Sequence, residues 1–165
     1  MAIYRVKQFV WAITSKFRPI DKKLVDRYLN KEEKKLFNQL RVSDRQHCIR
    51  VCNDALEKCK HEDIDKNKLA KIALLHDLGK ISSSLNIIDK SVIVILNKIT
   101  KGKLKKYNLN RKVDTYYNHP KKSVDLLKDI HEYDNEFLEA IEKHHYKEVG
   151  SNLYLKIVKE CDDNN

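Results

Sequence analysis

The sequence contains very little glycine and proline. Only three Gly and two Pro occur among its 165 residues, well below the average usage of about 7% and 5%. An all-β sandwich or barrel needs a turn about every 8–12 residues, and these two residue types are among the commonest in turns. Their scarcity therefore argues against a β-rich fold and favours a chain made of helices.

Long hydrophobic runs are also absent from the sequence. No apolar stretch reaches the ~18 residues that a membrane-spanning helix needs. Arg5 and Lys7 interrupt the apolar pattern at the N-terminus, and no small-residue cleavage site follows it. The four cysteines include no CxxC pair, and Cys48, Cys52 and Cys59 recur at helical spacing, as small apolar residues on a helix face do. We therefore expect a cytoplasmic protein without a transmembrane segment.

Negative charge is under-represented, because 34 Lys and Arg stand against 24 Asp and Glu and leave a net charge of +10. Eight of the basic residues lie between Lys101 and Lys122, where Asp114 is the single acid. A field of this sign attracts nucleotides, nucleic acid or acidic lipid headgroups, and a solvated loop is the simpler interpretation. The apolar N-terminal face, which includes Phe9 and Trp11, would either make peripheral contact with a membrane or dock on the domain core. Docking is favoured.

Apolar residues recur with a helical period along most of the chain. Helices are expected over residues 3–17, 21–29 with Asp21 as N-cap, 31–40, from Ser43 or Asp44 to about 60, 66–78, beyond Pro120, 135–146, and from Ser151 to 161. Gly79 is expected to end the helix over 66–78 in a left-handed cap. The β-branched run over 91–99 is assigned to a buried helix, because no second strand-like run exists to pair with it. The prediction is one compact all-α domain, with N-terminal helices in residues 1–40 packed on a core of residues 41–165.

The main functional signal is a set of five His and two Asp at helix ends or on apolar helix faces. His144 lies seven residues after Phe137, and Asp162 lies four residues after Val158, so both continue an apolar face. A carboxylate buried there carries a large desolvation cost unless it is paired or binds a metal. The full set is His47, His76, Asp77, His119, His144, His145 and Asp162.

These residue types point to transition-metal binding. Imidazole and carboxylate ligands without thiolate suit Mn, Fe, Co, Ni or Zn. Seven ligands exceed what one ion usually takes from protein, whereas two ions that share one bridging carboxylate would account for all of them. The remaining histidines, His61 and His131, lie beside acidic residues on polar stretches and are expected on the surface.

The order of these residues resembles that of the HD-domain superfamily of metal-dependent phosphohydrolases. The stretch HDLGK over residues 76–80 is similar to the signature of the HDIG subgroup, and the likeness extends from about Arg45 to Asp162, with His119-Pro120 as a further shared step. The resemblance implies an all-α bundle of at least five helices around a binuclear metal site. It therefore implies a cofactor of two divalent transition-metal ions.

The resemblance also implies which residues hold each ion. One ion would be bound by His47, His76, Asp77 and Asp162, and the second by Asp77 as the bridge with His119, His144 and His145. Helical phase favours Asp162 over Asp163 as the last ligand. Two such ions lower the pKa of a bridging water and bind phosphoryl oxygens, so the implied reaction is hydrolysis of a phosphate ester, with a nucleotide the favoured substrate.

Two basic residues are candidate phosphate contacts. Lys80 closes the HDLGK stretch and forms, with Asp77, the expected catalytic pair; a solvated lysine after a helix cap is its alternative. Arg50, one turn after the first histidine of the set, would bind phosphate oxygens in a bidentate manner, and a surface ion pair is its alternative. Lys121 and Lys122, which follow the His-Pro step, are further candidates.

Two departures from the family pattern narrow the function. No Gly-Tyr-Pro element follows the histidine pair, and Ser123 stands where a glycine often follows His-Pro. Both argue against a cyclic di-GMP phosphodiesterase. The predicted function is hydrolysis of a small-molecule phosphate ester with no obligatory nucleic acid. One alternative is a catalytically inactive nucleotide-binding regulatory module of the same fold, and another is a protein that associates with membrane or nucleic acid.

Overall fold

The computed structural model describes residues 19–59, 64–82, 93, 96–101, 103 and 111–165. Within these ranges the chain is helical and contains no β-strand, which confirms the all-α prediction. The helices that build the described part of the fold are the α-helices α2 (Lys22–Tyr28), α3 (Lys31–Phe37), α4 (Val42–Lys58), α5 (Lys66–Leu75), α7 (Arg111–Lys128), α8 (Asn135–Lys143) and α9 (Leu153–Asn164), and the 3-10 helix η2 (Leu78–Ser82). No helix in the described part of the chain is long and apolar enough to cross a bilayer. The predicted helix over 3–17 and His61 lie outside the described residues.

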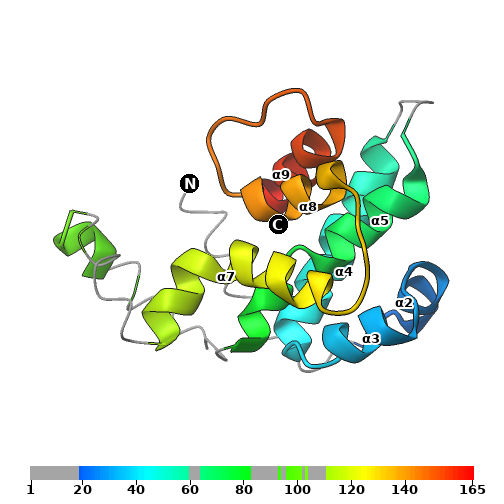
Figure 1. Ribbon diagram of the computed structural model, residues 1–165, viewed down its shortest axis with the longest axis horizontal. Coiled ribbons are helices and arrows are strands. Elements are labelled where there is room, and N and C mark those ends of the chain that lie inside the picture. The colour runs from blue at the N-terminus through cyan, green and yellow to red at the C-terminus, as the bar shows by residue number, and fades with distance from the viewer. Residues whose placement is uncertain (1–18, 60–63, 83–92, 94–95, 102, 104–110) are drawn as a thin grey trace.

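The hydrophobic core lies where α4, α5, α8 and α9 meet. α5 packs against each of the other three, and its Leu69, Ile72 and Leu75 side chains are fully buried. In Figure 1, α8 and α9 lie at the top of the view, α2 and α3 lie together at the right, and α7 runs from the left towards them. α2 and α3 pack on α5, while α7 packs on η2 and α8. This packing brings the C-terminal ends of α5 and α8 close to α4, α7 and α9.

Of the N-cap residues predicted for three helices, one is confirmed and the other two predictions are wrong. Asp21 caps α2 as expected, because its carboxylate accepts the Leu24 backbone N–H at 3.0 Å. α4 begins at Val42 after one extended residue, so the predicted caps Ser43 and Asp44 lie inside its first turn instead. α9 is capped by Asn152 rather than by Ser151, which lies in the turn just before the cap. The Asn152 carboxamide performs the capping that the serine was expected to provide.

Pro120 does not stand at a helix start, as the sequence had suggested, but inside α7. A proline in a helix lacks the N–H that would bond to the carbonyl four residues earlier, which here belongs to Tyr116. The imidazole Nδ1 of His119 lies 3.2 Å from that carbonyl oxygen and from that of Thr115. His119 thus supplies the donor that Pro120 removes, and α7 continues through the proline.

The run over 91–99 is helical where it is described, but it is not buried as a whole. Ile93 is buried against Val113 of α7. By contrast, Leu96 is 40% exposed and Ile99 is 70% exposed. The prediction of a helix was right and the prediction of burial was wrong for these two residues, because β-branched composition indicates apolarity without showing which surface covers it.

Gly79 has a different role from the one its position suggested. Its backbone is not left-handed, and Gly150, with φ +56°, is the described glycine that is. A Cβ on Gly79 would collide with the backbone carbonyl of His119 and would lie 2.8 Å from the Lys122 Cβ. The glycine is therefore required for the close approach of η2 to α7 rather than for a helix cap.

Candidate metal centre

Two histidine-containing pairs occupy equivalent positions at the ends of two helices. α5 and α8 each end one residue before their pair, so that His76 and His144 are the C-cap residues. Both helices end three residues earlier than expected. The Nδ1 of His76 lies 2.8 Å from the Ala73 carbonyl oxygen, and the Nδ1 of His144 lies 2.6 Å from that of Ile141. Because a carbonyl only accepts, each Nδ1 carries the proton. Each imidazole thus satisfies a free carbonyl of the last helical turn and directs its Nε2 away from the helix.

His119 is oriented in the same way from the middle of α7. Its Nδ1 lies 3.2 Å from the carbonyl oxygens of Thr115 and Tyr116, of which Pro120 leaves the second without its usual donor, and Nε2 is the ring nitrogen that faces the centre. Ligand histidines in metalloproteins are typically fixed by such a hydrogen bond from the second ring nitrogen to a carbonyl or carboxylate. Three histidines from three helices therefore have the tautomer that a metal ligand needs.

The potential ligand atoms gather in two groups. The first consists of His47 from α4, His76 from the end of α5 and Asp162 from α9, with all ligand atoms within 4.8 Å of one another. In it, Asp162 Oδ1 lies 2.8 Å from His47 Nε2 and 3.7 Å from His76 Nε2. Asp163, the competing residue, is exposed and pairs with Lys159 at 3.0 Å, so the helical phase of α9 turns Asp162 towards the centre.

The second group consists of His119, His144 and His145, whose ligand atoms also lie within 4.8 Å of one another. The Nε2 atoms of His119 and His145 are 3.1 Å apart, and the rings of His144 and His145 lie with their centroids 4.0 Å apart. His144 is fully buried, whereas the His145 side chain is 45% exposed. This group therefore lies at the edge of the centre that faces solvent.

Asp77 lies between the two groups and faces both of them. Its Oδ2 is 3.5 Å from His76 Nε2 and 3.7 Å from His47 Nε2, both in the first group. Its Oδ1 is 3.3 Å from His119 Nε2, in the second group. One carboxylate thus presents one oxygen to each group, which is the geometry that a bridging ligand requires.

The chemistry of these donors fits divalent cations. The Nε2 atoms of His76 and His144 are buried and have no hydrogen-bond partner among the described residues, although buried polar atoms normally have one. Two ligands at about 2.1 Å from a tetrahedral ion lie about 3.4 Å apart, and most of the separations above are close to this value. The arrangement is therefore able to hold two ions without a large rearrangement.

The protonation states of the centre also favour cation binding. Burial raises the pKa of Asp77, but Lys80 and the neighbouring imidazoles outweigh it and hold this pKa well below its ordinary value. Burial holds the pKa of His144 well below its ordinary value and, together with His119, lowers that of His145 to about 4. At neutral pH the carboxylate is ionised and these imidazoles are neutral, which are the forms that bind metals.

The predicted phosphate contacts are held in different ways. Lys80 is not solvated, because its side chain is only 16% exposed and its Nζ contacts Asp77 Oδ2. The Arg50 Nε donates to Asn165 Oδ1 at 3.3 Å, which links α4 to the residue that follows α9. Lys122 pairs with Asp114 on its own helix. Lys80 thus contacts one of the candidate ligands directly.

Two further residues beside the centre, Asp44 and Cys48, were not predicted from the sequence to lie there. Asp44 is buried in α4 one turn before His47, a spacing that would have revealed it. Burial lowers the pKa of Lys80, but Asp77 and Asp44 outweigh it and raise this pKa. Cys48 lies close to the HD pair, and burial raises its pKa well above the ordinary value, so that it stays a neutral thiol, as expected for a small apolar residue.

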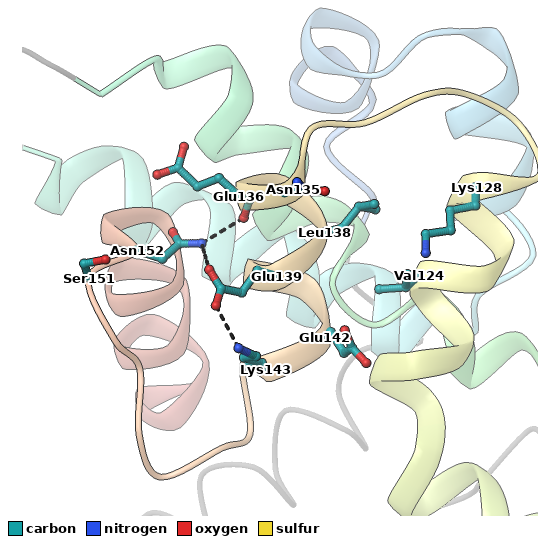
Figure 2. A pocket seen from close by; sticks show the side chains of 10 residues that line it. All are labelled: Val124, Lys128, Asn135, Glu136, Leu138, Glu139, Glu142, Lys143, Ser151 and Asn152. Carbon is teal, nitrogen blue, oxygen red and sulfur yellow. Dashed lines mark hydrogen bonds and ion pairs between the residues drawn. The ribbon is translucent and has the colours of Figure 1, made fainter.

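A polar groove between α7, α8 and the start of α9 lies apart from these ligands. Figure 2 shows its lining, which includes Val124, Lys128 and Glu139, and shows the Asn152 carboxamide bound to α8. None of the seven candidate ligands lines it. His131 lies on the surface as predicted. The centre and the groove are therefore separate features of the molecule.

Comparison with known families identifies the class of protein that this fold and centre define. The HD domain family matches residues 45–163, well over half of the sequence, and the chain belongs to this family. Members of the family are generally metal-dependent hydrolases. No curated protein and no solved structure matches the chain. The family expected from the ordered His and Asp residues is thereby confirmed.

Proposed function

We propose that this protein is a phosphohydrolase that cleaves a small-molecule phosphate ester, with a nucleotide as the favoured substrate. The proposal places the chain in the HDIG subgroup, on the strength of the HDLGK stretch over residues 76–80. The observation that carries it is the position of Asp77, which presents one oxygen to each of two groups of imidazoles. A single carboxylate between two ligand groups favours a two-ion centre over a mononuclear one.

The proposed ligands follow from the two groups. One divalent ion is held by His47, His76, Asp77 and Asp162, and the second by Asp77, His119, His144 and His145. Their identity is Mn, Fe, Co, Ni or Zn, the metals that nitrogen and oxygen donors without thiolate accept. When bound, the ions supply Lewis-acid activation of a water and neutralise charge on phosphoryl oxygens.

The protein groups around the ions have their own roles in this proposal. Asp77 orients both ligand groups through its two oxygens, and Lys80 places an ammonium group beside it, where a phosphate oxygen would approach. Arg50 lies one turn after His47 on α4, and its guanidinium is proposed as a second phosphate contact, because guanidinium groups bind phosphate oxygens in a bidentate manner. Exposed His145 marks the side from which a substrate would reach the centre.

The proposal is tested with elemental analysis of the purified protein and an assay of nitrophenyl phosphate mono- and diesters and of nucleotides with added Mn²⁺. We expect two metal equivalents and turnover that falls on the order of 10³-fold in Asp77→Ala, comparable to loss of a key electrostatic group in other hydrolases. His131→Ala, an exposed histidine outside the centre, is the matched control and should keep full activity.

Two other outcomes would contradict the proposed function. Bound metal without turnover of any of these compounds would favour the non-catalytic regulatory module, in which the same fold binds a nucleotide without hydrolysing it. Turnover that is unchanged in Asp77→Ala would contradict the proposed centre, because the carboxylate proposed to bridge the two ions would then be dispensable.

A further inference from the structure

One buried hydroxyl connects the two segments that carry the proposed ligands. Ser123 lies one turn after His119 on α7 and is fully buried. The Gly79 backbone N–H donates to its Oγ at 2.7 Å. The Ser123 hydroxyl in turn has two carbonyl acceptors, those of His76 and His119, each 2.9 Å away, and its one proton is shared between them. The backbone at both ends of the HDLG turn is thus bound to α7 through a single side chain.

The contact between these two segments leaves little room for adjustment. Because a Cβ at Gly79 would collide with the His119 carbonyl group, η2 and α7 meet backbone to backbone. The serine hydroxyl accepts the buried Gly79 N–H. Without it this N–H would have no acceptor, which would lower the stability of the folded state. Shape and hydrogen bonding therefore determine together how far α7 lies from the HD pair.

The distance between α7 and the HD pair determines how far the second ligand group lies from the first. His76 and Asp77 begin the turn that Ser123 binds, and His119 lies on the helix that carries Ser123. The contact between Asp77 Oδ1 and His119 Nε2, at 3.3 Å, joins the first ligand group to the second. Functional constellations tolerate displacements of only about 0.5 Å, so that a shift of α7 against η2 would separate the bridge from the second group.

We propose that Ser123 is a positioning residue that fixes the separation of the two metal sites by binding the HD turn to α7. The inference rests on the proposed two-ion centre. It assigns a purpose to the buried Ser123 hydroxyl, because an alanine or glycine at this position would have no side-chain oxygen to accept the Gly79 N–H. The second ion depends on this contact more than the first, since His119 reaches the centre from α7, whereas His47 and Asp162 reach it from α4 and α9.

The test is a calorimetric Mn²⁺ titration of the full chain, with electron paramagnetic resonance to detect exchange coupling between two Mn²⁺ ions. We expect Ser123→Ala to weaken the second ion about 10- to 100-fold, the usual effect of removing a group that orients a ligand, with the first ion changed less than about threefold. The coupled Mn²⁺ signal should diminish accordingly. Turnover is recorded separately and does not decide the inference.

Thr115→Val is the matched control for this experiment. Thr115 is a fully buried hydroxyl residue on the same helix, but its side chain contacts Lys122 rather than the HD turn. The variant loses a buried hydroxyl and should keep both affinities and the coupled signal. If Ser123→Ala does not fold, Ser123→Cys replaces it, because a thiol is a poorer hydrogen-bonding group of similar shape and should weaken the second ion in the same direction.

The outcomes separate this inference from the proposed function. Wild-type protein that binds only one ion would contradict the two-ion centre and the role of Ser123 with it. Wild-type protein that binds two ions, together with a Ser123 variant of unchanged affinities and coupling, would overturn the positioning role alone. Two coupled ions that Ser123→Ala weakens as expected, without any hydrolysis by the wild type, would support the role of Ser123 and remove the catalytic proposal.

Discussion

The buried carboxylate of Glu33 and the buried imidazoles of the candidate metal centre differ in how completely protein groups satisfy them. Glu33 lies in α3 and is fully buried. Its Oε1 accepts from Lys71 Nζ at 2.8 Å and from Tyr133 Oη at 2.9 Å, and its Oε2 accepts from the Asn30 backbone N–H at 2.7 Å and from Lys71 at 3.0 Å. Both oxygens therefore have two donors within the chain.

The metal centre is arranged in the opposite way. The Nδ1 atoms of His76 and His144 are bound to backbone carbonyl groups, but their Nε2 atoms are buried and lack hydrogen-bond partners among the described residues. A cluster with complete hydrogen bonding stabilises a fold. A cluster whose unpaired ligand atoms, here imidazole Nε2, face one another is stabilised by the ion that it binds. The difference teaches that burial of charge alone does not mark a functional site; the direction of the unpaired atoms does.

Replacing Lys71, the positively charged partner of Glu33, gives the largest expected change in stability. Lys71→Met leaves the Glu33 carboxylate buried without a counter-charge, and we expect a loss of about 3 kcal/mol in the free energy of unfolding, the lower end of the range for a broken buried pair. The Lys71 side chain is 30% exposed, which is why the lower end applies. Urea unfolding measures the change, and metal content should stay at the wild-type level.

Glu33→Gln is the matched variant, because it removes the charge and keeps most of the volume. Its expected cost is about 1 kcal/mol, that of disturbed hydrogen bonds. The double variant should be more stable than the sum of the two single losses predicts, since neither charge is left unpaired. Additive losses, or loss of metal in Lys71→Met, would show that the two clusters are not independent.

Adding metal tests the incomplete cluster, and the expected effect is slightly smaller. A ligand at about 100 times its dissociation constant stabilises the folded state by about 2.7 kcal/mol. We expect Mn²⁺ to raise the free energy of unfolding of the wild-type protein by about this amount relative to the protein in EDTA. Asp77→Asn, which keeps the shape of the side chain and removes its charge, should lose most of the gain. An equal gain in both proteins would place the ion elsewhere.

Helical phase explains why much of the centre could be predicted from the sequence. The direction of a side chain on a helix follows from its spacing to apolar neighbours, so His144 could be placed inward from Phe137 and Ile141 alone. The same reasoning placed Asp162 towards the centre and Asp163 away from it, as the exposure of Asp163 shows. Local periodicity contains this information because it concerns residues within one helix.

The rest depends on contacts between distant segments, which periodicity does not report. Glu33 lies among charged residues at a helix start, where glutamate is normally exposed, and its partners Lys71 and Tyr133 are 38 and 100 residues away. The need for Gly79 likewise depends on a helix that approaches it from another part of the chain. None of these contacts has a signature in its local sequence.

The smallest expected effect concerns Asn152, whose carboxamide is fully satisfied, as in the Glu33 cluster. Its Oδ1 caps α9 at the Leu155 N–H, and its Nδ2 donates to the Glu136 carbonyl at 2.9 Å and to Glu139 at 3.1 Å (Figure 2). Asn152→Ala should cost about 1 kcal/mol, the usual value for an N-cap, while metal affinity stays unchanged, because α9 remains held by its buried apolar face. Thermal unfolding and Mn²⁺ titration measure both quantities. A weakened metal affinity would mean that complete polar clusters, too, position the ligands, and the distinction between the two kinds of cluster would fail.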